Sequence, residues 1–103
     1  MYGLNQKDID SINDIFSQYS QISKVILFGS RAKGNYKNGS DIDLTIFSDE
    51  MDLQTLHKIE LEIDDLLLPY KVDLSIYSDL KSENLKEHIK RVGIIFFKNR
   101  VIE

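Results

Sequence analysis

The sequence has no cysteine and no tryptophan, and only one of its 103 residues is proline. Without cysteine, neither a disulfide framework nor a thiolate zinc site is possible. No apolar run approaches the ~18 residues that a membrane-spanning helix needs, and the start of the chain lacks the pattern of a secretory signal. We therefore expect a cytoplasmic protein with no membrane association.

Positive charge is also in deficit. The chain has 13 lysines and arginines against 17 aspartates and glutamates, a net charge of -4. Proteins that bind nucleic acid extensively usually carry a positive surplus, because they must neutralise phosphates. Extensive nucleic-acid binding is therefore not expected. A single nucleotide remains compatible with this charge, since Mg²⁺ can bridge carboxylates and phosphates.

The composition is otherwise that of an ordinary globular protein, with 42% hydrophobic and 29% charged residues. A chain of this length has room for one hydrophobic core. No repeat, linker or low-complexity segment divides it. We therefore expect residues 1–103 to form a single domain.

Hydrophobic spacing predicts the secondary structure. Helical periodicity is found at residues 5–19, 53–67 and 85–92. Asn5 or Asp8 could cap the first of these helices, and Pro69 would stop the second. A short helix is expected at 30–33. Apolar or alternating runs predict strands at residues 24–28, 41–47, 72–76 and 94–97.

The expected order is therefore α-β-(short α)-β-α-β-α-β. The connection between the first two strands is too short for a full crossover, so this pair should be antiparallel. The sequence thus predicts an α+β fold in which a mixed sheet is covered on one face by helices.

Two aspartates are placed unusually on the second predicted strand. Asp41 and Asp43 are two residues apart, so both side chains leave the same face, while Ile42 points toward the core. Two carboxylates about 5 Å apart, at an effective dielectric constant near 20, repel each other by roughly 3 kcal/mol. A bound dication such as Mg²⁺, or alternatively Mn²⁺, turns this repulsion into attraction.

An Asp-x-Asp pair alone is more often a turn or a solvated strand edge. Asp73 adds to the pattern, because it is a third carboxylate within an otherwise apolar strand. If the second and third strands are neighbours in register, Asp73 joins the face of Asp41 and Asp43. Three carboxylates there could hold two metal ions about 3.5–4 Å apart, as suits in-line displacement at phosphorus.

A second candidate feature follows the first predicted strand. Gly29 would let the backbone approach a phosphate, and Ser30 would add a hydroxyl donor. Ser30 could instead only cap the short helix. Arg31 and Lys33 could reach phosphate oxygens or be solvated helix charges, and Tyr36 could contact a base or cover the loop.

Taken together, residues 29–34 (Gly-Ser-Arg-Ala-Lys-Gly) and 40–44 (Ser-Asp-Ile-Asp-Leu) resemble the fingerprint of the polymerase-β-like nucleotidyltransferases. That fingerprint is Gly-Ser, a spacer of ten residues, and Asp-x-Asp. Ten residues also separate Ser30 from Asp41 here. The sequence is most similar to minimal nucleotidyltransferases, the MntA-type antitoxins that pair with HEPN-domain toxins, and the resemblance covers nearly the whole chain.

The resemblance implies a metal-dependent transfer of AMP from ATP to a hydroxyl, such as a tyrosine of a HEPN toxin. Asp41 and Asp43 would hold both Mg²⁺ ions, Asp73 would ligate the catalytic one, and Gly29 with Ser30 would bind the β- and γ-phosphates. Two alternatives stay open from the residues. One is an antitoxin that only masks its partner, and the other is nucleotidyl transfer to a small molecule.

Overall fold

The computed structural model describes residues 2–37 and 39–99. Its elements along the chain are α1 (Gln6–Phe16), β1 (Ile22–Phe28), α2 (Ser30–Lys33), β2 (Ile42–Ser48), α3 (Leu53–Asp64), β3 (Val72–Ile76), the 3₁₀ turn η1 (Tyr77–Asp79), α4 (Glu83–Val92) and β4 (Ile94–Lys98). All expected helices and strands are present in the expected order. The turn η1 is the one element here that the sequence pattern did not predict.

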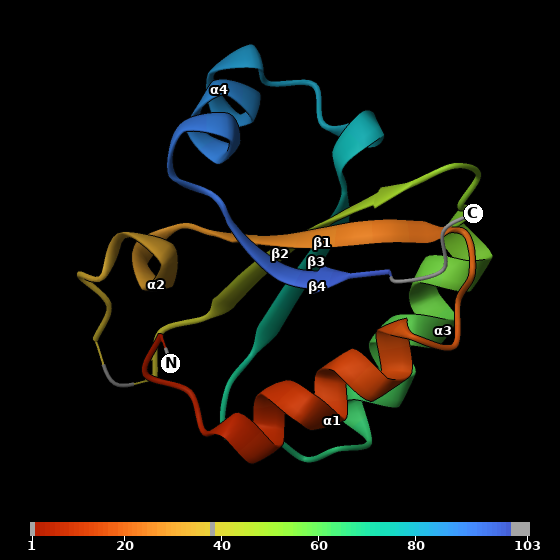
Figure 1. Cartoon of the computed structure of the whole chain (residues 1–103), viewed down its shortest axis with the longest axis horizontal. Coiled ribbons are helices and arrows are strands. Elements are labelled where there is room, and N and C mark those ends of the chain that lie inside the picture. The colour runs from red at the N-terminus through yellow and green to blue at the C-terminus, as the bar shows by residue number, and fades with distance from the viewer. Residues whose placement is uncertain (1, 38, 100–103) are drawn as a thin grey trace.

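The strands form one sheet with the spatial order β3-β2-β1-β4 (Figure 1). β1 pairs antiparallel with β2 and with β4, while β2 and β3 are parallel and are joined through α3. The antiparallel first pair and the mixed sheet are therefore confirmed. β3 is an edge strand of this sheet, so one of its sides has no neighbouring strand among the described residues.

Side chains cap the three longer helices. Asn5 accepts a hydrogen bond from the backbone N–H of Lys7 at the start of α1, so Asn5 rather than Asp8 is the cap. Asp52 and Ser82 play the same part for α3 and α4. Such caps satisfy amides that have no partner within the helix, typically worth about 1 kcal/mol each. Within the described parts of the chain, no helix is long and apolar enough to span a bilayer.

The end of α3 differs from the expectation. The helix ends at Asp64, well before Pro69, and Leu67 has a left-handed backbone with φ of 56°. A residue in that conformation breaks the helical path, so Pro69 is not what stops the helix. Leu67 is 87% exposed and does not belong to the apolar face of the helix.

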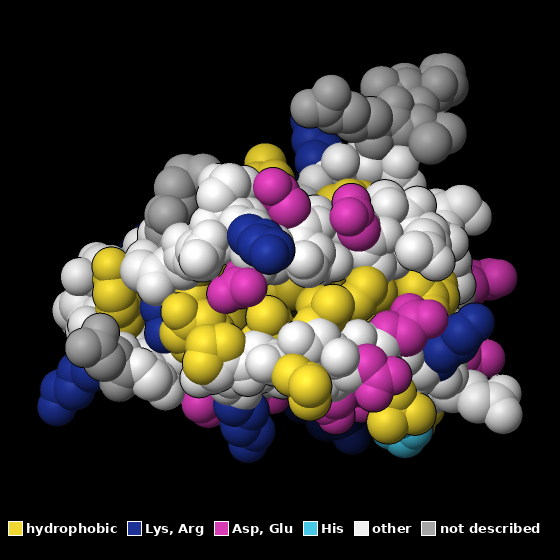
Figure 2. Space-filling model, turned by 90° about the horizontal axis from the view of Figure 1, so that it is seen from below, with side chains coloured by type: hydrophobic (Ala, Val, Ile, Leu, Met, Phe, Trp, Pro, Cys, Tyr) yellow, Lys and Arg dark blue, Asp and Glu magenta, His cyan; other side chains and the backbone are white. Residues whose placement is uncertain are grey.

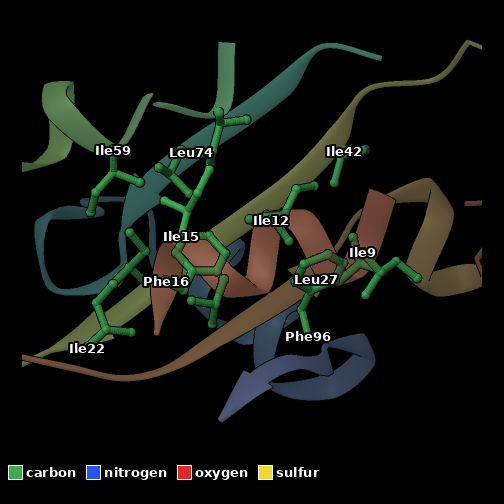
Figure 3. Close-up of a cluster of buried hydrophobic side chains, with 14 of the residues drawn as sticks. Ile9, Ile12, Ile15, Phe16, Ile22, Leu27, Ile42, Ile59, Leu74 and Phe96 are labelled. Atoms are coloured by element: carbon green, nitrogen blue, oxygen red, sulfur yellow. The ribbon is translucent and has the colours of Figure 1, made fainter. Parts of the chain in front are cut away.

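The main core lies between one face of the sheet and the two helices α1 and α3. Figure 3 shows side chains from both helices and from the strands converging there. Among the fully buried members are Ile12, Phe16, Ile22, Val25, Leu27, Ile42, Leu44, Ile46 and Ile59. On β2, every second residue contributes, so the intervening positions are turned to the opposite face.

α4 corrects one part of the predicted architecture, in which all helices cover one face. It lies on the other side of the sheet from α1 and α3 (Figure 1). Ile89 of α4 is buried, and Gly93 at its end lies against the side chain of Ile26. Ile26 pairs with Thr45 and shares the face of Phe28 and Asp43. The second face of the sheet is therefore partly covered.

A groove of about 680 Å³ is lined by residues of α3, β3 and the segment between them. Leu61 and Leu67 are exposed members of its lining. Figure 2 views the molecule from the side of α1 and α3 and shows a band of hydrophobic side chains bordered by acidic ones. Leu74 of the groove belongs to the core face, so the groove lies on the opposite side of the sheet from Asp43 and Asp73.

Two residues of α3 test the assignment of its buried face. Ile59 is fully buried, whereas Leu61 is 64% exposed. We expect Ile59→Ala to lower the free energy of unfolding by about 2–5 kcal/mol, because it leaves a cavity. Leu61→Ala, the matched control, should change it by less than about 0.5 kcal/mol. Urea unfolding followed by circular dichroism measures both, and equal effects would contradict the assigned face.

Candidate active site

Two aspartates face each other across the parallel strands. The register of β2 and β3 pairs Asp43 with Asp73 and Ile42 with Val72. Paired residues direct their side chains to the same face, so the two carboxyl groups lie beside each other. Ile42 is fully buried on the other face, which fixes the direction of Asp43. This is the arrangement that the sequence pattern predicts for neighbouring strands in register.

Asp41 lies immediately before β2 and is exposed, whereas Asp43 is half-buried. Burial raises the pKa of Asp43 above its ordinary value, and the negative charges of Asp73 and Asp41 raise it further. A cation paired with Asp43 would lower this pKa instead. The two other carboxylates therefore add to the effect of burial on the pKa of Asp43.

Gly29 brings the backbone directly against the carboxylate. Phe28, the last residue of β1, pairs with Asp43, and Gly29 follows with a left-handed φ of 78°. A Cβ atom added at Gly29 would collide with Oδ2 of Asp43. Both the backbone conformation and the close approach therefore require glycine at this position. The space beside Asp43 is one that any side chain at position 29 would fill.

Ser30 and Lys33 begin and end the four-residue helix α2. The N-cap of this helix is Gly29, which has no side chain, so the alternative that Ser30 serves only as a cap is wrong. Ser30 is half-buried next to Gly29, and its carbonyl accepts hydrogen bonds from the N–H groups of Gly34 and Asn35. Lys33 is exposed.

Arg31 differs from both roles considered for it. It is only 3% exposed, so it is not a solvated charge. Its Nε and Nη2 atoms donate to the carbonyl of Ser40, and Nη1 donates to the carbonyl of Tyr2. Because these donors are engaged inside the fold, the arrangement does not support Arg31 as a phosphate ligand.

The carboxylates do not form a closed coordination cage. Among the residues that the structure describes, no three acidic, histidine or cysteine side chains are close enough together to hold a metal ion by themselves. Mg²⁺ in proteins is commonly bound by one or two carboxylates, with water and substrate phosphates completing its shell. Asp43 and Asp73, side by side, supply a donor set of that kind.

Residues 10–101 match the polymerase beta nucleotidyltransferase family. A probable protein adenylyltransferase MntA from Haemophilus influenzae is 30% identical over 93 residues, which cover 89% of this chain and 81% of the relative. The chain belongs to the polymerase beta nucleotidyltransferase family. The fingerprint noticed in the sequence, with Gly29, Ser30, Asp41 and Asp43, therefore lies in a true member of that family.

Solved structures show the same fold at lower identity. A toxin–antitoxin complex with AMP-PNP is 21% identical with a TM-score of 0.70, over 94% of this chain and 76% of the other. The MNT antitoxin complex with a tri-AMPylated HEPN toxin from Shewanella oneidensis is 19% identical with a TM-score of 0.67, over 97% of this chain and 75% of the other. These likenesses confirm the nucleotidyltransferase fold.

The structure adds two polar residues that the sequence reasoning missed. Thr45 and Ser75 are the next pair on the same face as Asp43 and Asp73. Thr45 is fully buried, and its hydroxyl has no hydrogen-bond partner within the described residues, while the Ser75 hydroxyl donates to the carbonyl of Leu44. The alternation of Asp-x-Thr and Asp-x-Ser along the two strands was the available signal.

The raised pKa of Asp43 gives a prediction for stability. The native state binds the Asp43 proton more tightly than the unfolded chain does, so ionised Asp43 opposes folding above its folded-state pKa. At pH 7 without divalent metal, we expect Asp43→Asn to stabilise the chain by up to about 1 kcal/mol, the range for facing like charges. The gain should disappear as the pH falls toward the ordinary aspartate value of 3.8.

Urea unfolding in a metal chelator at several pH values measures this difference. Asp49→Asn, which changes an exposed aspartate just after β2, is the matched control and should have little effect. A loss of stability on Asp43→Asn at pH 7 would indicate that a cation, rather than two carboxylates, faces this side chain.

Proposed function

We propose that this nucleotidyltransferase transfers AMP from ATP to a hydroxyl of a HEPN-domain toxin, most simply a tyrosine, and so acts as its antitoxin. The observation that carries the proposal is the placement of Asp43 beside Asp73 and directly against the glycine backbone of residue 29. We propose that these carboxylates hold a metal and that the glycine backbone beside them contacts a phosphate.

The relatives support the choice of nucleotide and partner. The Haemophilus influenzae relative is described as a probable protein adenylyltransferase, which is an enzyme that attaches AMP to a protein. Among the structural neighbours, one complex contains AMP-PNP, an ATP analogue, and another contains a HEPN toxin that carries AMP groups. ATP as the nucleotide and a HEPN toxin as the acceptor are therefore the choices that we propose for this chain.

The residues present fit a divalent metal. Asp43 and Asp73 face each other with Asp41 nearby, and the negative charges of Asp73 and Asp41 add to burial in raising the pKa of Asp43. We propose that Asp41 and Asp43 hold two Mg²⁺ ions, with Mn²⁺ as a substitute, and that Asp73 ligates the one near the acceptor. Such ions lower the pKa of an attacking hydroxyl and neutralise the leaving phosphates.

The protein's own part in the reaction is mainly to bind and orient. Gly29 and Ser30 would contact the β- and γ-phosphates, and the exposed Lys33 could add a positive charge. The acceptor oxygen forms a bond to the α-phosphorus, the bond to the bridging oxygen breaks, and pyrophosphate leaves. Deprotonating a tyrosine of pKa near 10 at pH 7 requires about 4 kcal/mol. Asp73 is exposed, so the released proton can pass to solvent there.

The acceptor would come from outside this domain. Asp73 lies on the edge strand β3 and is exposed, so a partner side chain can approach it without crossing the sheet. We propose that residues 1–103 act as one minimal nucleotidyltransferase domain, in the cytoplasm where ATP is available. Masking of the toxin without catalysis, and transfer to a small molecule, are the alternatives that an experiment must separate.

Asp43→Asn tests the proposed transfer. We expect labelling of a co-purified HEPN partner from radiolabelled ATP to fall by at least about a hundredfold. This is more than the loss usually seen when a residue that only orients a metal ligand is replaced. Complex formation should persist, because asparagine has nearly the shape and volume of aspartate and Asp43 is not a core residue. The intact mass of the partner, measured for the addition of AMP, gives an independent readout.

Asp49→Asn is again the control and should label the partner normally. If the Asp43→Asn variant still neutralises its toxin as well as the unaltered chain does, masking is the correct account. Labelling of a small molecule in the absence of any partner would favour the third alternative.

A further inference from the structure

The arginine that follows the Gly-Ser pair is built into the interior of the fold. Arg31 is 3% exposed, and its guanidinium lies over two aromatic rings, 5.1 Å from the ring centre of Tyr36 and 4.9 Å from that of Tyr70. Burying a guanidinium is costly unless its donors are satisfied. Here two of its nitrogens donate to the Ser40 carbonyl at 3.1 and 2.9 Å, and the third donates to the Tyr2 carbonyl at 2.9 Å.

Arg31 and one of its hydrogen-bond partners lie next to residues of the proposed site. Ser40 directly precedes Asp41, and Arg31 itself directly follows Ser30. The forked contact with one carbonyl therefore connects the start of α2 to the chain that carries Asp41. A planar guanidinium makes such a paired contact with defined geometry, which a lysine ammonium cannot reproduce.

The third carboxylate is connected to the same residue by a second route. Tyr70, whose ring contacts the guanidinium, lies just before β3 and three residues ahead of Asp73. The N–H of Ile42 donates to the carbonyl of Lys71 at 2.8 Å, which joins the starts of β2 and β3. Contacts of Arg31 and of the neighbouring backbone thus hold both the segment before Asp41 and the segment before Asp73 in place.

We propose that Arg31 is a positioning residue for the metal and triphosphate site, and that it acts by holding the segments before Asp41 and Asp73 against α2. Its guanidinium donates to the backbone carbonyls of Ser40 and Tyr2 rather than to the side chain of a proposed ligand. This inference rests on the proposed function, since it assumes that Asp41, Asp43 and Asp73 bind a divalent metal. It assigns Arg31 to the site by a route different from the direct phosphate contact that the sequence suggested.

Binding of Mn²⁺ in the presence of AMP-PNP tests the inference without any measurement of activity. Free Mn²⁺, followed by its electron paramagnetic resonance signal, gives a Kd for each variant of the full chain. Arg31→Met should raise this Kd by roughly 10- to 100-fold, the usual effect of losing a residue that orients metal ligands. Arg31→Lys keeps the charge but not the fork, so it should give an intermediate value.

Two controls separate positioning from folding. Arg91→Met removes an exposed arginine from α4 and should leave the Kd unchanged. Circular dichroism and urea unfolding establish that each Arg31 variant is folded under the binding conditions. If Arg31→Met is unfolded, two other variants replace it in the test. These are Arg31→Lys and Tyr70→Leu, the second of which removes an aromatic ring that contacts the guanidinium. Both should weaken Mn²⁺ binding.

The outcomes distinguish this inference from the proposed function. In one outcome the unaltered chain binds Mn²⁺ with AMP-PNP and Asp43→Asn does not, while the folded Arg31 variants bind as tightly as the unaltered chain. The positioning role is then overturned and the function stands. If the unaltered chain and Asp43→Asn bind equally, the proposed metal site itself is overturned, and the positioning role with it.

Discussion

The register between β2 and β3 is the constraint on which the site depends. Asp43 and Asp73 are paired across these strands although their carboxylates repel each other. The register is held from the opposite face, where alternate residues of β2 (Ile42, Leu44 and Ile46) are fully buried. A slip by one residue would turn these apolar side chains to the solvent. Hydrophobic packing under the helices therefore stabilises an arrangement of like charges that would not form by itself.

The sequence was sufficient to predict the helices and strands and their order, because apolar periodicity is a local signal. It also predicted that Asp43 and Asp73 share a face if β2 and β3 are neighbours in register, and the structure pairs them in that way. It did not predict that α4 lies on the other side of the sheet. Helical periodicity shows that a helix has an apolar face, such as that of Ile89, but not which face of a sheet receives it. The left-handed backbone at Leu67, which ends α3 early, was equally hidden.

Arg31 shows why a site cannot be completed from a motif alone. In the sequence it stands among glycine, serine and lysine, as a phosphate-binding arginine would. Its burial depends on carbonyls of residues 2 and 40 and on rings of residues 36 and 70, which come together only in the folded chain. Gly29 was predicted to let the backbone approach a phosphate, and that contact stays a prediction. The structure adds that the group it approaches is the carboxylate of Asp43.

A crystal structure of the chain with AMP-PNP and Mn²⁺ tests the central claim most directly, because anomalous scattering locates the metal without assumptions about the ligands. The account predicts Mn²⁺ bound between Asp43 and Asp73, with the β- and γ-phosphates against the backbone of Gly29 and Ser30. Mn²⁺ or triphosphate bound elsewhere on the molecule, with these aspartates remaining free of metal, would contradict it.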